Sequence, residues 1–391
     1  MDFAFGPDDD AFRSDAREWL AAHRGDAAGR DWERELGDGG WIGIGWDDGG
    51  AYGGRRAGLT QQVVWAEEYA RARAPARAGH IGENLLAPTL IAYGSDAQRQ
   101  RFLPAIARGE ELWCQGYSEP GAGSDLAGVR TVAVRDGGAY RVTGQKIWTS
   151  LAQDADWCFV LARTGEARPG ARRHHGLSFL LVPMDQPGRI EVRPIRQMTG
   201  TSEFNEVFFD GALAREVVGG EGNGWRVAMG LLALERGVST LVQQIGFAEE
   251  LREVVRLAVE AGAGGWGEGA GDPVVRARLV RLWAELHTMR ANALRTLGTS
   301  GGGPGAPSVA KLLWGGWHQR LGELAVQVRG AAATVGPYDW DEERPYELDS
   351  LQKLFLFSRA DTIYGGSDEI QRDIIAERVL GLPRERERES G

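Results

Sequence analysis

The residues with the clearest chemical potential form a glycine-rich stretch of small and hydroxyl side chains, Gly116–Asp125. Small residues let backbone amides approach a ligand closely, and Ser118 and Ser124 add hydroxyl groups. The stretch lacks the GxxxxGK[ST] pattern of a phosphate-binding loop, and it does not connect a strand to a helix as in a dinucleotide-binding unit. Taken alone, it is either a ligand-binding loop or an ordinary turn.

Three further segments carry side chains with chemical potential. Gly144–Ser150 combines an aromatic ring with hydroxyls, and Ile363–Arg372 contains two adjacent glycines followed by polar residues. The third, Leu231–Arg236, is an apolar run that ends in Glu235. A carboxylate beside apolar side chains is a candidate base, because burial raises its pKa. The alternative is that Glu235 is a surface residue of a helix.

The spacing of apolar residues, which indicates the elements that must position these segments, changes along the chain. Helical spacing dominates the first third, short alternating stretches with turns follow, and long helical periods then return. The sequence therefore predicts a multidomain α+β fold with an N-terminal helical domain over residues 1–112 and a middle small β-barrel domain over residues 113–218. A C-terminal helical bundle over residues 219–383 and a disordered tail over residues 384–391 complete the prediction.

The individual elements follow from the same patterns. The expected helices are Ala11–His23, Leu59–Arg73, Leu85–Tyr93, Asp96–Ile106, Trp225–Glu260, Val274–Leu297, Ser308–Ala333, Leu351–Ile363 and Glu369–Val379. The expected strands, which form a small sheet or barrel, are Arg130–Arg135, Tyr140–Thr143, Trp157–Ala162, Leu177–Val182, Ile190–Ile195 and Glu206–Asp210. Loops are expected over the glycine-rich stretch Gly37–Gly58.

Composition excludes several classes of protein. The 391 residues carry 45 basic and 55 acidic side chains, a formal charge of −10, which argues against a general nucleic-acid binder. No apolar run has the length of a membrane span, and the acidic start is unlike a secretory signal, so a cytoplasmic protein without a membrane segment is expected. Two cysteines and six scattered histidines predict no metal site. Only three lysines occur, Lys146, Lys311 and Lys353.

Together, these motifs resemble those of the acyl-CoA dehydrogenase family in order and spacing. The resemblance is carried by Gly116–Asp125, by Gly144–Ser150 and by Ile363–Arg372 with its continuation to Pro383. It extends to Tyr93–Glu110 and covers nearly the whole chain. The resemblance implies a flavoprotein oxidoreductase of fatty acid metabolism that acts on CH–CH groups and uses FAD.

The resemblance also implies a set of site residues. Those implied for cofactor binding are Tyr117, Ser118, Gly123, Ser124, Trp148, Thr149, Ser150, Gln327, Gly330, Gly366, Ser367 and Asp368. Those implied for substrate binding are Ser124, Arg236 and Gly365. A flat flavin ring needs an aromatic side chain or a sheet edge against it, and its polar rim needs small donors.

The family's reaction converts an acyl-CoA to a trans-2-enoyl-CoA, as a carboxylate takes the α-proton and FAD takes the β-hydride. Many members carry that carboxylate directly after the tyrosine of the Tyr364 motif, where this chain has Gly365. A second version of the family carries it on an earlier helix, in a leucine-rich stretch ending Glu-Arg. Glu235 matches that position and is the expected catalytic base.

Partners are implied by the same resemblance: an acyl-CoA or acyl-carrier-protein thioester, electron-transfer flavoprotein as acceptor, and a homodimer or homotetramer. The family's Arg-x-x-Phe-Gly contact to a neighbouring flavin is replaced here by the glycine-rich Ala261–Pro273. Arg276 or Arg278 is a candidate replacement. Three alternatives stay open: a carrier-protein thioester dehydrogenase of a biosynthetic pathway, a flavin monooxygenase of the same fold, and a non-catalytic subunit of a mixed assembly.

Overall fold

The computed structural model describes residues 5–23, 25–165, 173–234, 238–264, 269–298, 305–336 and 347–383. Internal contacts divide the chain into two compact units. The sheet unit comprises Ala4–Arg196 and Ser202–Ser239, and the bundle unit contains Gln197–Thr201 and Thr240–Gly391. The expected tail, residues 384–391, lies outside the described residues.

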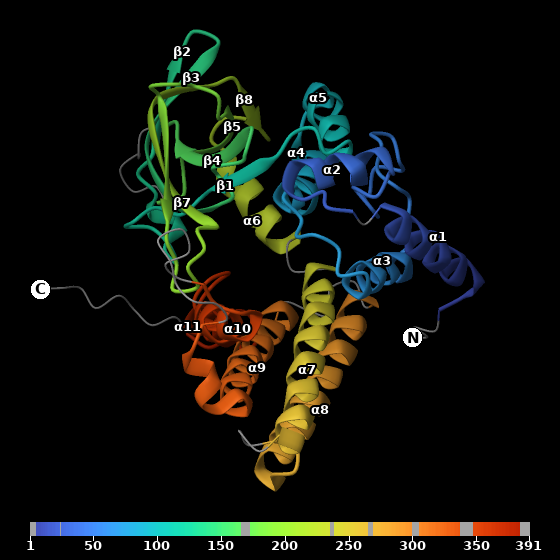
Figure 1. Cartoon of the computed structure of the whole chain (residues 1–391). Coiled ribbons are helices and arrows are strands. Elements are labelled where there is room, and N and C mark those ends of the chain that lie inside the picture. Colours follow the sequence, from blue (N-terminus) through green and yellow to red (C-terminus); the bar gives the residue numbers. More distant parts are fainter. Residues whose placement is uncertain are drawn as a thin grey trace, which may run out of the picture. The chain divides into compact units, whose positions relative to one another are not determined.

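Five helices form the first part of the sheet unit (Figure 1): α1 (Pro7–His23), α2 (Gly29–Asp38), α3 (Leu59–Arg71), α4 (Ala87–Tyr93) and α5 (Asp96–Ala107). Helix α1 forms because its apolar residues recur at helical spacing and bury Phe12, Ala16 and Leu20 on one face. Helix α5 begins at Ser95, whose hydroxyl accepts a hydrogen bond from the Gln98 amide.

A single turn of π-helix, Gly82–Leu86, leads directly into α4. The sequence predicted an ordinary helix from Leu85 to Tyr93, and apolar spacing does not distinguish the wider π-turn. The sequence also gave no prediction of α2, which has only Trp32 and Leu36 as buried apolar residues.

The middle of the sheet unit is an eight-stranded sheet whose main path runs β6–β7–β3–β2–β4–β5–β8, while β1 pairs with β4. Its strands are β1 (Trp113–Gly116), β2 (Val132–Asp136), β3 (Ala139–Ser150), β4 (Trp157–Arg163), β5 (Leu177–Pro183), β6 (Ile190–Ile195), β7 (Phe204–Ala214) and β8 (Glu216–Val218). The expected hairpin between β2 and β3 turns at Gly137, whose φ of +60° favours glycine. The buried runs of β4 and β5 pair antiparallel through the core.

Helix α6 (Gly224–Leu234) packs against β5 and buries Val227, Ala228 and Leu231. Gly224 permits this approach, because a Cβ there would lie 2.4 Å from the Ser178 carbonyl carbon. The sequence predicted one helix over Trp225–Glu260. Within that range the structure describes α6 and the first part of α7 (Val238–Gly264), and residues 235–237 between them lie outside the described part of the chain.

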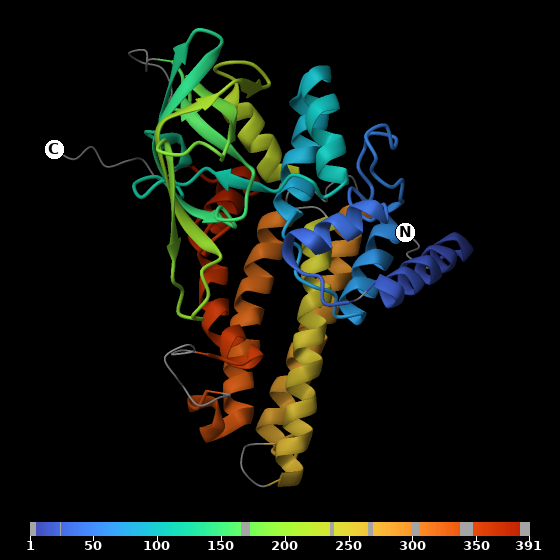
Figure 2. The same ribbon diagram turned by 45° about the horizontal axis from the view of Figure 1, so that its top comes forward.

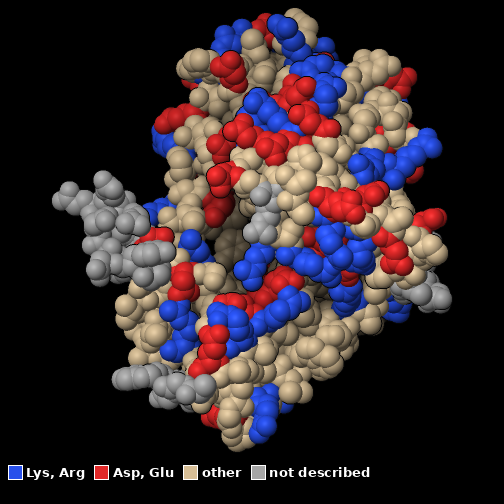
Figure 3. All heavy atoms as spheres, turned by 45° about the vertical axis from the view of Figure 1, so that its right-hand side comes forward, with Lys and Arg blue, Asp and Glu red and all other residues tan. Residues whose placement is uncertain are grey.

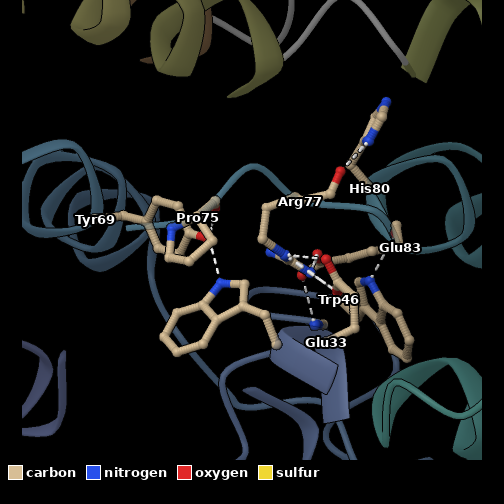
Figure 4. Close-up of polar contacts among 9 residues, drawn as sticks. Glu33, Trp46, Tyr69, Pro75, Arg77, His80 and Glu83 are labelled. Carbon is tan, nitrogen blue, oxygen red and sulfur yellow. Dashed lines mark hydrogen bonds and ion pairs between the residues drawn. The ribbon is translucent and has the colours of Figure 1, made fainter. Parts of the chain in front are cut away.

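A buried ionic cluster joins α2, the loop after α2, the segment between α3 and the π-turn, and the π-turn itself (Figure 4). The Arg77 guanidinium donates to both oxygens of Glu33 and, at 2.6 Å, to Glu83. Glu83 also accepts a hydrogen bond from the Gly43 amide at 2.7 Å. Glu33 is fully buried, so its charge depends on Arg77 for compensation. This cluster, which no sequence pattern indicated, fixes the chain at the entrance to α4.

The bundle unit consists of long helices around its own core. Besides α7, the helices are α8 (Pro273–Gly298), α9 (Ala306–Arg329), α10 (Ser350–Phe357) and α11 (Asp368–Arg378). Figures 1 and 2 show α7 and α8 side by side. Trp317, Leu321 and Leu324 of α9 lie at the centre of the core. A short 3-10 segment, Ser358–Thr362, follows α10 and packs on α9.

Charged side chains of both signs are interspersed over the face shown in Figure 3. This agrees with the sequence, in which 45 basic residues accompany 55 acidic ones. Within the described helices, none combines the length and the apolar character that crossing a bilayer requires.

Candidate functional site

The loop that follows β1 is a tight, closed structure. The Glu119 amide donates to the Ala122 carbonyl at 3.1 Å, and the Ala122 amide donates back at 3.0 Å. The Ile147 amide of β3 donates to the Ser118 carbonyl at 3.0 Å. The structure therefore brings the first two sequence motifs, Gly116–Asp125 and Gly144–Ser150, side by side in the sheet unit.

A buried ion pair fastens this loop to β3. The Lys146 side chain is fully buried, and its ammonium donates to Glu119 Oε1 at 2.9 Å and to the carbonyls of Tyr117 and Leu161 at 2.9 and 2.8 Å. Glu119 accepts two further hydrogen bonds, from the backbone amides of residues 130 and 131. Burial opposes ionisation of Glu119, but Lys146 and these donors outweigh it, so the pKa of Glu119 lies below its usual value.

Trp148 has an unusual backbone in the same motif. Its φ is +60°, a conformation that non-glycine residues rarely adopt, and the pairing of β3 with β7 shifts register between Lys146 and Thr149. The indole is 56 % exposed and meets Phe204 edge-on. Residues in sparsely populated backbone conformations persist only where the surrounding structure holds them in place, and they cluster at functional sites.

Next to Trp148, Thr149 is buried, and its hydroxyl has no hydrogen-bond partner among the described residues. The Asn205 side chain donates to the Thr149 carbonyl at 3.0 Å, so the backbone here is fixed while the hydroxyl stays available. A buried hydroxyl without a partner is costly unless a ligand satisfies it. Gly123 and Ser124 are exposed, and a Cβ at Gly123 would meet nothing within 4 Å.

The third motif lies in the bundle unit as a turn between the 3-10 segment and α11. Gly365 and Gly366 have φ values of +63° and +86°, and a Cβ at Gly366 would lie 2.4 Å from Gln371 Nε2. That Gln371 amide donates to the carbonyls of both glycines at 3.2 Å. Ser367 caps α11 by accepting a hydrogen bond from the Ile370 amide, which gives it a structural role.

The remaining implied cofactor residues are also in the bundle unit. Gln327 lies at the end of α9, where its side-chain oxygen accepts a hydrogen bond from Arg278 of α8. Gly330 ends α9 with φ +57° and ψ −135°, a backbone that favours glycine. Asp368 Oδ1 is buried without a hydrogen-bond partner among the described residues. Of the two candidate replacement arginines, Arg278 thus contacts Gln327, whereas Arg276 is exposed.

The sequence-derived residues therefore fall into two sets, each ordered within one unit. The sheet unit holds Tyr117, Ser118, Gly123, Ser124, Trp148, Thr149 and Ser150, and the bundle unit holds Gln327, Gly330, Gly365, Gly366, Ser367 and Asp368. The expected base Glu235 and the expected substrate contact Arg236 lie outside the described residues.

Sequence reasoning missed the role of Lys146. A signal was present, because Lys146 is one of only three lysines in the chain. It stands inside the motif Gly144–Ser150, and the next charged residue after it is Asp154. What was absent was its partner, since Glu119 lies 27 residues earlier. The contacts of Glu119 give it a structural role in holding this loop.

The residues around Trp148 fit a flat group with a polar rim, such as a flavin. An exposed aromatic face, an unsatisfied buried hydroxyl at Thr149 and open space at Gly123 are the features that such a group requires. Among the described residues, no cluster of three or more histidine, cysteine or acidic side chains has the geometry to hold a metal ion.

Comparison with known protein families gives three matches along the chain. Residues 9–110 match the family model described as acyl-CoA dehydrogenase, N-terminal domain. Residues 114–212 match the middle domain of the same family, and residues 222–380 match its C-terminal domain.

Individual proteins are similar over nearly the same length. The chain is 51 % identical to acyl-CoA dehydrogenase IpdE1 of Mycobacterium tuberculosis, over 97 % of this chain and 99 % of that protein. A solved structure entitled Tcur3481-Tcur3483 steroid ACAD is 27 % identical with a TM-score of 0.83, over 98 % of this chain and 100 % of that chain. The ChsE4-ChsE5 complex of Mycobacterium tuberculosis is 30 % identical with a TM-score of 0.81, at the same coverages.

Proposed function

Since this chain belongs to the acyl-CoA dehydrogenase family, we propose that it removes two hydrogens from the α and β carbons of an acyl-CoA thioester, with FAD as cofactor. The chain is accordingly an oxidoreductase that acts on CH–CH bonds. The observation that carries the proposed FAD site is the strained, exposed Trp148 beside the unsatisfied hydroxyl of Thr149.

The chain's own residues have distinct tasks in this proposal. When bound, FAD would supply the acceptor for the hydride that leaves the β-carbon. Trp148 would cover the flat ring, and the Thr149 hydroxyl would meet its polar rim. Gly123 and the neighbouring Ser124 would let the backbone and a hydroxyl approach the cofactor and the thioester. The Lys146–Glu119 pair would keep this loop in place before any ligand arrives.

Glu235 is the proposed base that takes the α-proton. The support is its place in the sequence, directly after Leu231–Leu234, and the presence of glycine at position 365. Gly365 carries no acid, and its φ of +63° disfavours any side chain there. A base in an apolar setting has a raised pKa, which brings it closer to that of the polarised α-carbon acid.

The proposed substrate class is a steroid-derived acyl-CoA thioester. The support is the structural relative Tcur3481-Tcur3483, a steroid ACAD to which this chain is 27 % identical. Electron-transfer flavoprotein is the proposed acceptor of the electrons, as the sequence resemblance implies.

Anaerobic bleaching of the flavin tests the proposal. Purified protein reconstituted with FAD is mixed without oxygen with steroid-side-chain acyl-CoAs and with straight-chain acyl-CoAs. We expect bleaching, fastest with the steroid-derived thioesters. Glu235→Gln should retain flavin and bleach roughly 10²–10⁴-fold more slowly, the usual contribution of a positioned base.

Glu260→Gln is the matched control, because Glu260 is an exposed glutamate that pairs with Arg256 on the surface of α7. It should bleach at the normal rate. A Glu235→Gln protein that bleaches as fast as the control would refute the base assignment. Faster bleaching by straight-chain thioesters would refute the substrate class.

A mixed assembly is the second candidate, because the ChsE4-ChsE5 relative is a complex of two different proteins. In that case this chain would need a second, related chain to hold the flavin or to supply the base. The test compares the flavin content of this chain expressed alone with its flavin content when it is co-expressed with a second member of the acyl-CoA dehydrogenase family. Full flavin content and bleaching in the homogeneous protein would exclude this candidate.

A further inference from the structure

A buried polar cluster in the bundle unit lies directly before the turn Ile363–Gly366. Asp361 is 1 % exposed, and His318 of α9 is 6 % exposed. Lys311, which precedes His318 on the same helix, is 8 % exposed. Buried charged groups are rare unless they are paired, so their mutual contacts decide what the cluster does.

His318 lies between two carboxylates. Its Nδ1 hydrogen bonds to Asp361 Oδ2, and its Nε2 hydrogen bonds to Glu250 Oε2 of α7 at 2.8 Å. An ionised carboxylate only accepts hydrogen bonds, so both ring nitrogens must carry a proton. Hydrogen bonds from both ring nitrogens to ionised carboxylates fit an imidazolium, whose positive charge compensates the buried carboxylate of Asp361.

Asp361 accepts two further hydrogen bonds. Its other carboxylate oxygen, Oδ1, accepts a hydrogen bond from the Tyr364 hydroxyl at 2.8 Å. Its backbone carbonyl accepts a hydrogen bond from the Lys311 ammonium. That ammonium also lies 3.9 Å from the ring centroid of Trp314 and 4.6 Å from that of Tyr364. Asp361 therefore connects α7 and α9 to the first residues of the turn.

The far side of the turn is held independently, because Gln371 of α11 binds the carbonyls of Gly365 and Gly366. We propose that His318 and Asp361 are positioning residues for the turn Ile363–Gly366, and that the turn keeps its shape only while His318 is protonated. The inference rests on the proposed function in one respect, namely that Gly365 and Gly366 of this turn have the substrate-binding and cofactor-binding roles that the sequence resemblance implies.

Among the described residues, the charged groups that hydrogen bond to His318 are two carboxylates, and both favour its protonated form. Glu250 faces it from α7, Asp361 from the 3-10 segment, and Tyr364 and Lys311 contact Asp361 from the turn and from α9. The other close neighbour is the apolar ring of Phe247, at 4.3 Å between centroids. Burial alone would lower the pKa of His318, but the hydrogen bonds and charges of Asp361 and Glu250 raise it to about 9.

The direction of the pH effect follows from this raised pKa. A histidine in the unfolded chain has a pKa near 6.5. The contribution of His318 is fully present below about pH 6.5 and is lost as the pH rises through about 9. The turn should therefore loosen on the alkaline side, in a range where the unfolded chain's histidines are already neutral.

Hydrogen exchange read by mass spectrometry tests the proposal on the FAD-reconstituted protein. Protection factors of the peptide over residues 358–372 and the FAD dissociation constant are measured from pH 6 to pH 10. We expect protection and FAD affinity to be constant up to about pH 8 and to fall together near pH 9. His318→Gln should lower both by about tenfold or more at neutral pH and should abolish the alkaline change.

Glu250→Gln gives a sharper test, since it keeps an acceptor for Nε2 but removes one charge. It should move the alkaline transition to lower pH, which loss of packing alone would not do. Tyr364→Phe, which removes one hydroxyl, should reduce protection of the turn if His318→Gln does not fold. His287→Gln is the control, because His287 is an exposed histidine on α8, and it should leave the transition in place.

Unchanged protection in His318→Gln and in Tyr364→Phe, or an unmoved transition in Glu250→Gln, would overturn the inference. Its failure is distinguishable from failure of the proposed function. If no thioester bleaches the flavin but the protection of the turn depends on His318, the inference about His318 and Asp361 stands and the proposed reaction is wrong. If bleaching is normal but substitution of His318 leaves the protection of the turn unchanged, the proposed reaction stands and the inference about His318 is wrong.

Discussion

Replacing Lys146 by methionine is the most direct test of how the loop Tyr117–Asp125 is held. Methionine has a similar length but no charge, so three acceptors lose the hydrogen bond that Lys146 donates: Glu119 Oε1 and the carbonyls of Tyr117 and Leu161. Glu119 is then a buried carboxylate without a counter-charge. Removing one partner of a buried pair costs about 3–5 kcal/mol. At about 2–4 °C per kcal/mol, the melting temperature should fall by roughly 10 °C.

The assay is thermal unfolding, with flavin absorbance measured on the same samples. Lys146→Met combined with Glu119→Gln should melt at a higher temperature than Lys146→Met alone, because the uncompensated charge is gone while an oxygen acceptor remains. The effect of Glu119→Gln should also depend on pH. The pKa of Glu119 is lowered in the folded state, so its contribution is present above the ordinary glutamate pKa and is lost as the pH falls through the lowered value.

Arg193→Met is the matched control for the loss of a basic residue, because Arg193 forms a solvent-exposed pair with Glu191. It should leave the melting temperature unchanged. A Lys146→Met protein that melts within about 2 °C of the wild type and keeps its flavin would refute the reasoning, since the buried pair would then be replaceable at no cost.

Two other changes separate structural from functional roles. Trp148→Gly removes a half-exposed ring from a position with φ +60°, so relief of strain should offset the lost packing and leave the melting temperature nearly unchanged, while flavin content falls. An equal loss of flavin and stability would contradict this. Arg77→Met leaves Glu33 and Glu83 without their shared cation and should cost about 3–5 kcal/mol in urea unfolding, with Arg193→Met again as the unaffected comparison.

Local patterns predicted the elements that depend on local physics. The alternation on either side of Gly137 predicted the β2–β3 hairpin, and the apolar run after Trp157 predicted the buried strand β4. Four-residue β1 carries too little alternation to be recognised, although it pairs with β4 in parallel over its whole length. A strand this short is stabilised by pairing with a segment far away in the sequence, and the sequence of the strand alone does not reveal that partner.

In the candidate site, too, local sequence predicted some features, whereas others depend on the folded backbone or on distant residues. Trp148 and Thr149 were identified by motif, but the positive φ of one and the unsatisfied hydroxyl of the other are properties of the folded backbone. The partners of Lys146 and His318 lie 27 and 43 residues away along the chain, so no local pattern could predict them. Glu235 remains a prediction from its place in the sequence.

The burial of lysine has a practical consequence for chemical labelling. Lys146 and Lys311 are both buried, and each ammonium is engaged in hydrogen bonds. Lys353 on α10 is the only other lysine, and it is partly exposed. Amine-reactive dyes and cross-linkers should therefore modify a single lysine side chain of the folded protein. One fluorophore at that place would report on the bundle without any engineered cysteine.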